Sequence, residues 1–582
     1  MRTSQANGIV NGIVSRAAIL LGTALLSALL TSACRPAETI PPTPIMAATV
    51  PAELATQAAL NRPPTPIITP RVAGETAVSP PPTSSPQPTT RPAGTVWRVG
   101  VDGSAPAGLV QEAAAFAARH PAQFAWVGEA EADVVVGLGG ERPFASWIFA
   151  AAAPFATVTD DVTLAALQAS WQGGGPPLVV DAATAGWLAD QWGAAGRSVY
   201  LTTPEKRVEQ VWQKRPSWSI LPFDELSPDL KVMRLDGQSP LAPDFAAEAY
   251  GLRAEVGVSG TETAVAAFLA AWDGPTTNRD ENKLTRIAMT GVTALVRATA
   301  YNMEQNGMLW PAEDVGPVLQ NADIAHISNE VSFAPDCPYP NPIGGTTFCS
   351  GDNTFELIKH LGTDVVELTG NHLNDWGAEN VVRSLEMYEA AGMATYGGGR
   401  NAAEAAEPAL FSHNGNQIAF VGCNSFGPTY AWAGAEQPGA RPCDGSLPGQ
   451  IAQLTADGYL VIATLQGTEY YQYPATPDQQ AQFRALAEAG ATAVSGSQAH
   501  HLQAFDFHNG VFIHYGPGNL FFDQMDQLGT RQTFVDTYHV YNGRLLSVSL
   551  WTGLIENYAK PRLMTPQERE QALTTIFQAS GW

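Results

Sequence analysis

Between residues 284 and 524 the chain repeats one pattern, a short apolar run that ends in glycine or a polar side chain. The clearest example is Thr363–Gly377 (TDVVELTGNHLNDWG), in which Val365 and Val366 lead to Asn371 and His372. Such runs predict buried strands, and parallel strands end at one edge of a sheet, where open α/β folds place their sites. Further runs are Arg286–Thr290, Ile324–Ile327, Gln417–Gly422, Tyr459–Thr464, Thr492–Val494 and Val511–His514. The pattern therefore predicts an α/β domain with one shared polar rim.

Three side chains after Val366 have direct chemical uses. Asn371 supplies an amide oxygen that can bind a metal or orient a ligand, and His372 can carry a proton near neutral pH. Asp375 can hold the His372 ring in one orientation if the loop turns back. The alternative is a polar turn that only caps a buried strand. Because several strands end in the same way, we predict that His372 and Asp375 are catalytic.

The chain has 582 residues, of which 45% are hydrophobic and 15% charged, and this composition predicts two or three globular domains. Its net charge of −24 argues against a nucleic-acid partner, because phosphates would be repelled. We predict a lipoprotein signal peptide at 1–34, a disordered Pro/Thr-rich linker at 35–95, an α/β domain at 96–275, a larger α/β domain at 284–560, and a C-terminal helix at 561–582.

The first 34 residues have the plan of an export signal. Arg2 and Arg16 are the only charges before the apolar run Ala17–Ala33, whose small final residues precede Cys34. A cysteine in this position is similar to the bacterial lipobox, where it is lipidated; a plain signal peptide or a short membrane anchor is the alternative. The Pro-rich stretch that follows predicts an extended stalk. We therefore expect an extracytoplasmic lipoprotein, anchored to the cell membrane through Cys34.

The four cysteines that remain after Cys34 are an even number, which in an exported protein suggests two disulfides. The pairing local in sequence is Cys337–Cys349 and Cys423–Cys443, each of which closes a loop rich in proline and glycine. Metal ligation is the alternative, and the absence of any CxxC spacing argues against it.

The segment 96–275 alternates short strands with helices, which predicts a separate α/β domain. Its stretches AAPFATVTDDVTLAALQASWQG, from Ala152, and WSILPFDEL, from Trp218, resemble extracytoplasmic solute-binding proteins. A generic α/β domain without a ligand is the alternative. The resemblance implies a smaller, solute-binding-protein-like domain before the larger one.

The larger domain, from about Leu284 to Tyr558, resembles the CapA family of capsule and poly-γ-glutamate synthesis proteins. The motifs are SNE at Ser328–Glu330, TGNHLNDWG at Thr369–Gly377, YGGGRNAAEA at Tyr396–Ala405, GTEYYQYP at Gly467–Pro474, SGSQAHHLQ at Ser495–Gln503, and YGPGNLFFDQ at Tyr515–Gln524. The resemblance implies a calcineurin-like metallophosphoesterase fold, which is a four-layer α/β sandwich.

Folds of this kind normally hold two divalent metals, which polarise an ester or amide oxygen and acidify a water. By resemblance, Glu330, Asn371 and His500 are metal ligands. His372 is then the proton donor or transition-state stabiliser beside them.

This sequence departs from the family pattern at three ligand positions. Val292 follows Gly291 where the family has aspartate, Leu465-Gln466-Gly467 stands where it has His-Trp-Gly, and Gln498 stands where it has the first histidine of His-Pro-His. Valine cannot bind a metal, and a glutamine carbonyl binds only weakly. We therefore expect one divalent metal ion at most, in a pocket that Val292, Gln466, Gln498 and Asn519 line.

Three functional interpretations follow. The first is an anchored CapA-type enzyme, a metallophosphoesterase-like hydrolase in exopolymer synthesis, release or attachment. Its partners would be an exopolymer or polar small-molecule substrate and a polymer-synthase complex. The second is a non-catalytic binding protein of the cell envelope that has lost metal-dependent hydrolysis. The third is a structural lipoprotein without a ligand, which the polar rim argues against.

Overall fold

A computed structural model describes residues 95–582. The predicted signal peptide, Cys34 and almost all of the Pro-rich linker lie outside the described residues. Among the helices of the described part, none is both long and apolar enough to cross a membrane.

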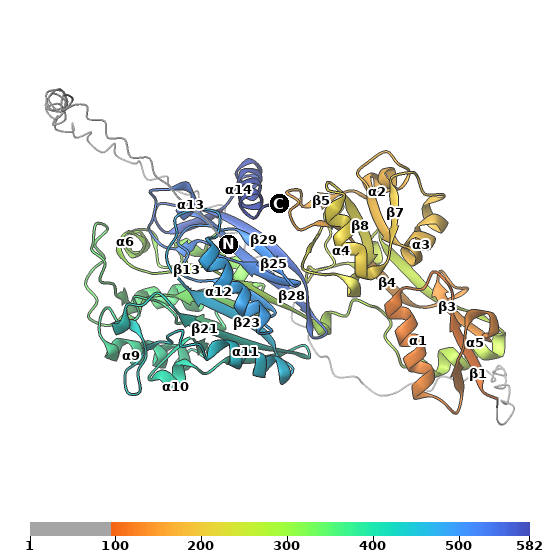
Figure 1. Ribbon diagram of the computed structural model, residues 1–582, viewed down its shortest axis with the longest axis horizontal. Coiled ribbons are helices and arrows are strands. Elements are labelled where there is room, and N and C mark those ends of the chain that lie inside the picture. The colour runs from red at the N-terminus through yellow and green to blue at the C-terminus, as the bar shows by residue number, and fades with distance from the viewer. Residues whose placement is uncertain (1–94) are drawn as a thin grey trace, which may run out of the picture. The chain divides into compact units, whose positions relative to one another are not determined.

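The first α/β region contains one nine-stranded sheet, with the strand order β2-β1-β3-β11-β4-β8-β6-β7 and β9 paired with β4 (Figure 1). Its strands are β1 (Trp97–Val101), β2 (Phe124–Trp126), β3 (Val134–Leu138), β4 (Arg142–Pro154), β5 (Asp161–Val162), β6 (Leu178–Asp181), β7 (Val199–Thr202), β8 (Trp218–Pro222), β9 (Leu230–Val232), β10 (Arg234–Leu235) and β11 (Arg253–Gly260). Its helices are α1 (Ala107–Arg119), α2 (Leu164–Trp171), α3 (Ala182–Trp192), α4 (Pro204–Gln213) and α5 (Glu262–Ala271).

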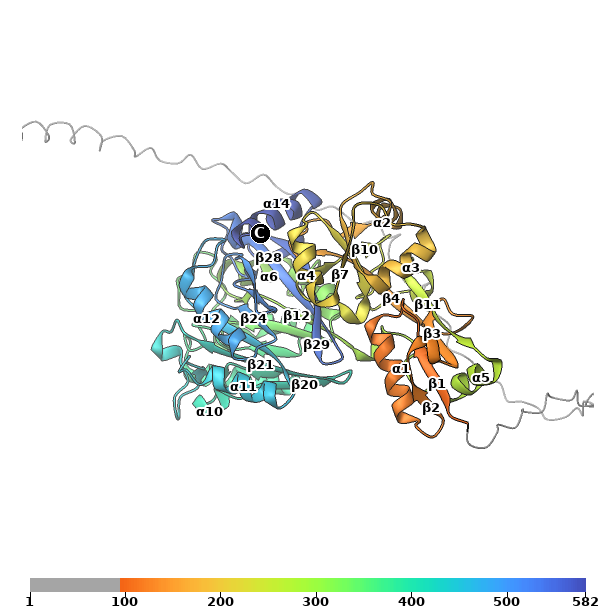
Figure 2. The same cartoon turned by 45° about the vertical axis from the view of Figure 1, so that its right-hand side comes forward.

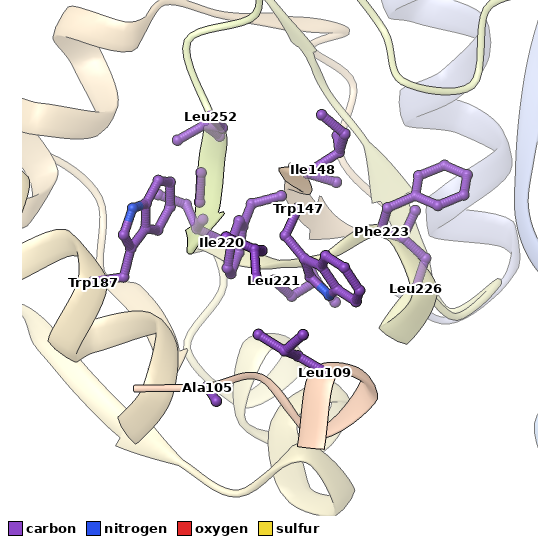
Figure 3. Packing of buried hydrophobic residues seen from close by; sticks show 14 of the residues in the cluster. Ala105, Leu109, Trp147, Ile148, Trp187, Ile220, Leu221, Phe223, Leu226 and Leu252 are labelled. Atoms are coloured by element: carbon purple, nitrogen blue, oxygen red, sulfur yellow. The ribbon is translucent and has the colours of Figure 1, made fainter. Parts of the chain in front are cut away.

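The core of this region forms because apolar residues recur at helix spacing in α1 and run continuously through β4. The residues of α1 that are buried are Leu109, Ala113, Phe116 and Ala117, which is the face that the sequence predicts. Figure 3 shows Leu109 pointing toward Trp147 of β4 and Leu221 of β8. The long strand β4 therefore contributes a continuous run of side chains to a single apolar core.

The second α/β region contains two larger sheets. Its strands are β12 (Leu284–Met289), β13 (Val292–Thr293), β14 (Ile324–Asn329), β15 (Phe333–Ala334), β16 (Ser350–Gly351), β17 (Val365–Glu367), β18 (Ala394–Tyr396), β19 (Gly398–Gly399), β20 (Ala409–His413), β21 (Asn416–Asn424), β22 (Gly439–Ala440), β23 (Leu460–Gln466), β24 (Ala493–Gly496), β25 (Phe505–His508), β26 (Val511–His514), β27 (Asn519–Phe521), β28 (Gln532–Tyr541), β29 (Arg544–Glu556) and β30 (Lys560–Leu563). Its helices are α6 (Arg297–Asn306), α7 (Gly316–Gln320), α8 (Phe355–His360), α9 (Ala378–Ala390), α10 (Ala402–Ala405), α11 (Leu447–Ala456), α12 (Pro477–Glu488), α13 (Leu528–Arg531) and α14 (Pro566–Ala579).

One of the two sheets has the order β18-β17-β14-β12-β28-β29-β30, and the other β20-β21-β23-β24-β26-β25. Strands β12, β14, β17 and β18 are parallel to their neighbours in this series, whereas β28 pairs with β12 antiparallel. In that pairing Ile287 lies opposite Tyr538, about 250 residues later in the chain. Strands β21, β23, β24 and β26 are also parallel. Parallel strands thus form one end of the first sheet and the middle of the second, as the apolar runs predict.

The two sheets pack face to face, because alternate residues of their strands point into a shared core. That core joins Ile287 and Val365 of one sheet to Phe420 and Ile462 of the other. The opposite faces are covered by helices, α6 to α9 on the first sheet and α11 with α12 on the second (Figures 1 and 2). The result is a helix–sheet–sheet–helix arrangement, the four-layer α/β sandwich that the resemblance implies.

The two regions belong to one compact unit. Phe155, which follows β4, is 2% exposed and packs edge-on against Phe505 and Phe512 in the core of the sandwich. Asp160 forms an ion pair with Arg569 of α14. Both an apolar and a charged contact therefore connect the first region to the second.

Candidate functional site

The predicted site residues follow the carboxyl ends of parallel strands in both sheets. Glu330 comes directly after β14, Asn371 follows β17, and Gln466 is the last residue of β23. Gln498 and His500 follow β24. Because these strands run in one direction within each sheet, their ends bring residues that are up to 170 positions apart in the chain to one rim.

Gln466 is the centre of a buried polar cluster. Its Nε2 lies 3.2 Å from Glu330 Oε1 and 3.2 Å from Asn371 Oδ1, and it also contacts Gln498 Oε1. Gln498 in turn donates from Nε2 to Glu469 Oε1 at 2.7 Å. The Gln466 amide nitrogen therefore connects two predicted ligands, Glu330 and Asn371. It faces them as an N–H donor, whereas a metal ligand would face them with a lone pair.

His500 is held with one ring nitrogen facing the carboxyl groups. Asn519 donates from Nδ2 to the carbonyls of His500 and Thr530, so its Oδ1 accepts from His500 Nδ1 at 2.7 Å. The other nitrogen, Nε2, lies 4.0 Å from Glu330 Oε2 and 3.8 Å from Glu469 Oε1. Burial lowers the pKa of His500, against the opposing pull of Glu469. The arrangement favours a neutral imidazole with its Nε2 lone pair toward the cluster.

Glu330 is buried, with 1% of its surface exposed. Its Oε2 has no hydrogen-bond partner within residues 95–582. Burial, together with the negative charges of Glu469, Glu367 and Asp375, raises the pKa of Glu330 well above its usual value. A carboxyl group in these surroundings keeps its proton to higher pH than an exposed glutamate, and can act as a proton donor.

His372 and Asp375 form a hydrogen-bonded pair, His372 Nδ1 to Asp375 Oδ2, at 2.6 Å. Asp375 is almost fully buried, and the His372 side chain is 20% exposed. In the described part of the chain His372 Nε2 has no hydrogen-bond partner. His372 also lies beside Glu330 in the fold, because a backbone bridge pairs it with Val331. The pair leaves Nε2 free to accept or donate a proton.

A second buried group of polar residues, which the sequence analysis missed, lies next to the Gln466 cluster. Glu367, the last residue of β17, accepts from Thr369 Oγ1 at 2.6 Å and lies 3.6 Å from His326 Nε2. Burial acts to raise the pKa of Glu367, but the interactions with His326 outweigh it, so the pKa is lowered. The hydroxyl of Thr369 also lies 3.4 Å from Gln466 Oε1, which joins this group to the cluster above.

Val292 has an apolar side chain and offers no polar atom to the rim. It is fully buried on β13, between Ser328 of β14 and Asn519 of β27. An aspartate in its place would extend toward the same rim, whereas valine contributes only apolar contacts.

The donor set does not fit a two-metal centre. In the described portion of the chain no group of three or more His, Cys, Asp or Glu side chains is arranged to hold a metal ion. The amide groups of Gln466 and Gln498 form hydrogen bonds with each other and with the neighbouring carboxyl groups. Glu330 Oε2, which has no hydrogen-bond partner within residues 95–582, lies 4.0 Å from His500 Nε2, and these two atoms fit one divalent cation at most.

Arg297 is a further residue of the site that the sequence analysis missed. Its φ of 45° lies in the left-handed region that non-glycine residues rarely adopt. Its guanidinium group lies 4.9 Å from the ring centroids of both Phe348 and Phe522. Those rings contact His372 and His500, with centroid distances of 4.3 and 5.0 Å. Arg297 is also paired with Asp523, so its guanidinium group is held near both imidazoles while its charge is balanced by that carboxylate.

Glu469 and Tyr430 were also missed, for different reasons. Glu469 lies inside the quoted motif GTEYYQYP, so the resemblance contains the signal although the residue type was not singled out. Tyr430 donates its hydroxyl to Asp375 Oδ1 at 3.0 Å from a loop without regular spacing. No local pattern in the sequence points to it.

The two predicted disulfides are present in the structure. Cys337 is bonded to Cys349, and Cys423 to Cys443. The pairing that is local in sequence is therefore confirmed, and both bridges lie in loops beside the rim.

These observations define a class of protein: a helix–sheet–sheet–helix sandwich with buried carboxyl, amide and imidazole groups at the carboxyl ends of its strands. Residues 286–524 match the family model described as bacterial capsule synthesis protein PGA_cap. This match confirms, for the second region, the resemblance to the CapA-type capsule and poly-γ-glutamate synthesis proteins.

Two CapA proteins are similar in sequence to part of this chain. The capsule biosynthesis protein CapA of Bacillus anthracis is 27% identical over 275 residues, which are 46% of this chain and 66% of that protein. The PGA biosynthesis protein CapA of Bacillus subtilis (strain 168) is 27% identical over 190 residues, 32% of this chain and 49% of that protein. The chain therefore spans about half to two thirds of the length of these relatives.

Similar solved structures include a 5'-nucleotidase precursor from Thermus thermophilus, with a TM-score of 0.27 and 12% identity, covering 51% of this chain and 58% of that one. They also include an ABC-type phosphate transport receptor from Vibrio cholerae, with a TM-score of 0.26 and 10% identity, covering 30% of this chain and 92% of that one. At such scores the likenesses carry no argument about the site.

Proposed function

We propose that the protein takes part in the synthesis, release or attachment of a capsule-like exopolymer, with poly-γ-glutamate as the first candidate. The observation that carries this proposal is the His372–Asp375 pair beside the buried Glu330, in a segment that matches the capsule synthesis family. The relatives' names supply the polymer class, and the chain's own residues supply acid–base groups.

In the proposed reaction His372 and Glu330 have opposite roles. His372 Nε2 takes the proton from the attacking water or amine, while Asp375 holds the ring and stabilises its charged form. Glu330 gives its proton to the leaving group, as a carboxyl with a raised pKa can do. Asn371 and Gln466 orient the carbonyl to be attacked. If a divalent cation binds Glu330 and His500, it would polarise that carbonyl instead, and Glu330 would then be ionised and would no longer be the proton donor.

We further propose that the mature protein is anchored outside the cytoplasmic membrane through Cys34. The support is the apolar run Ala17–Ala33, the small residues before Cys34 and the Pro-rich stretch after it. Intact-mass analysis of the membrane fraction should find a diacylglyceryl group on Cys34. A mature form cut at another residue would contradict the anchor without touching the proposed chemistry.

The test of the chemistry uses the purified full chain and poly-γ-glutamate of defined length. We expect the chain to shorten or transfer the polymer, and His372→Ala to slow this by about 100-fold, because general acid–base catalysis contributes at least that factor. Tyr339→Phe is the matched control, since Tyr339 is 63% exposed and touches none of the site residues named above. Metal analysis should find no more than one tightly bound divalent ion per chain.

The second candidate is a binding protein without catalysis, which the side chains at positions 292, 466 and 498 favour. It predicts that the full chain retains the polymer on a column but leaves its length unchanged, and that His372→Ala changes neither result. That outcome would replace the enzyme proposal with the binding one.

A further inference from the structure

The Asp375 carboxylate receives hydrogen bonds from three separate places. One is His372, which is its neighbour in the same turn. The other two are the backbone N–H of Phe348, which donates to Oδ2 at 3.0 Å, and the hydroxyl of Tyr430, which donates to Oδ1 at 3.0 Å. Two of the three donors thus come from parts of the chain far from residue 375, so the carboxylate is oriented from outside its own loop.

Both outside donors belong to loops that a disulfide closes. Phe348 directly precedes Cys349, whose partner is Cys337, and the ring of Phe348 also contacts His372. Tyr430 lies within the loop closed by the Cys423–Cys443 bridge. Each disulfide therefore holds one of the two groups that orient Asp375.

The second loop is also fixed to the turn that contains Asp375. Asn374 donates from Nδ2 to the carbonyls of Tyr430 and Pro438, at 2.8 and 2.9 Å. Tyr430 itself is 55% exposed, so its ring gains little from burial. What fixes this side chain is its hydroxyl, whose acceptor is a carboxylate with 2% of its side chain exposed.

We propose that Tyr430 is a positioning residue for the His372–Asp375 pair, and that the loops 337–349 and 423–443 are clamps that keep Asp375 facing His372. The proposal rests on the proposed role of His372. A carboxylate with three fixed donors cannot rotate away from the imidazole without losing two charge-assisted hydrogen bonds. The clamps therefore keep the proton on Nδ1 and the lone pair of Nε2 toward the substrate.

The test is an NMR measurement on the full chain labelled with ¹⁵N-histidine, which follows the exchange of the His372 Nδ1 proton with water. Exchange requires the hydrogen bond to Asp375 to open, so it reports the clamp directly. We expect Tyr430→Phe to speed it about tenfold, the factor that one hydrogen bond to a charged group is worth. The rate of polymer processing should fall by a similar factor with little change in KM, because the substituted group does not touch substrate.

The chain offers two matched controls. Tyr339→Phe removes a phenol hydroxyl from the first clamp, where it contacts Gln305 rather than Asp375, and should leave the exchange unchanged. His514 is an internal reference, since its Nδ1 lies 2.6 Å from Asp536 in a buried pair on β26 and β28, outside both loops. A variant that speeds exchange at His372 but not at His514 is folded and has lost only the clamp.

The disulfides are tested by the pairs Cys337→Ala with Cys349→Ala, and Cys423→Ala with Cys443→Ala. Each pair should speed exchange at His372 by at least the factor found for Tyr430→Phe, with His514 unchanged. The proposal is overturned if Tyr430→Phe and the second cysteine pair both leave the exchange of His372 as it is. If the exchange changes but polymer processing does not, the clamp stands and the proposed function fails.

Discussion

The two carboxyl groups of the candidate site are buried to a similar extent and are held in opposite ways. Asp375 accepts three hydrogen bonds, one of them from an imidazole, and both of its oxygens are held in place. Glu330 accepts one, from Gln466, and its other oxygen has no partner in residues 95–582. The carboxylate that three donors hold is suited to orient a base, and Glu330, whose pKa burial raises, is suited to give a proton.

This asymmetry leads to a prediction for Glu330→Gln. The substitution keeps the shape of the side chain and removes a buried acid whose Oε2 has no partner, so the free energy of unfolding should stay the same or rise by about 1 kcal/mol. Polymer processing should fall by about 100-fold, because the proton donor is lost. Denaturant titration at pH 7 and the rate of polymer shortening measure the two effects.

Glu367→Gln is the control for that experiment. Glu367 lies at the same rim and is paired with Thr369 and His326, so its loss should lower the free energy of unfolding by about 1–3 kcal/mol. If Glu330→Gln lowers the free energy of unfolding as much as Glu367→Gln does, Glu330 Oε2 has a hydrogen-bond partner and the prediction is wrong.

At the scale of elements, the sequence predicts the parallel strands well and the rest of the second region poorly. Each of β14, β17, β23 and β24 is an apolar run followed by a polar rim residue, a pattern that one stretch of chain contains completely. Strands β28 and β29 lack that ending, and β28 pairs with β12 about 250 residues away. The clamps of Asp375 were missed for the same reason, because a contact between distant loops leaves no spacing in the sequence.

Helix α12 begins with a capping box, in which Thr476 accepts from Gln479 N–H and the Gln479 side chain accepts from the Thr476 backbone N–H. We expect Thr476→Ala to lower the free energy of unfolding by about 1 kcal/mol, because one backbone donor of the first turn loses its partner. Denaturant titration measures this. Thr261→Ala is the control, since Thr261 starts α5 without a side-chain cap and its loss should change stability by a few tenths of a kcal/mol at most. Equal effects in both variants would rule out the cap as the cause.

At the scale of the whole molecule, the ion pair of Asp160 with Arg569 connects the two regions. It makes the stability of the fold at low pH depend on the Asp160 carboxylate. Burial acts to raise the pKa of Asp160, but Arg569 and Lys231 outweigh it and hold the pKa at about 2. The ordinary value is 3.8, so the folded state binds the proton less tightly than the unfolded chain. The ion pairs therefore stabilise the fold above about pH 4, and this contribution is lost as the pH falls toward 2.

We expect Asp160→Asn to remove a contribution of about 2 kcal/mol at neutral pH, because a pKa unit corresponds to about 1.4 kcal/mol. Between pH 4 and 2 the wild type should lose this stability, while the variant changes less. Lys231, whose pKa burial lowers to about 8, stays charged throughout this range and does not contribute to the slope. Urea titrations at several pH values measure the difference, and parallel curves for the two proteins would show that Asp160 does not carry the effect.

The pairing of β12 with β28 also determines when the first sheet of the sandwich can be completed during synthesis of the chain. The first strand of the sandwich lies between β14, which follows within 40 residues, and β28, which is made only near the end of the chain. Until β28 emerges, one edge of β12 presents unpaired backbone groups that can pair with another chain. Contacts of such long sequence separation are formed slowly, because the intervening loop must be closed first. A chain truncated before residue 532 would therefore lose the strand that covers this edge, although every residue of the candidate site would still be present.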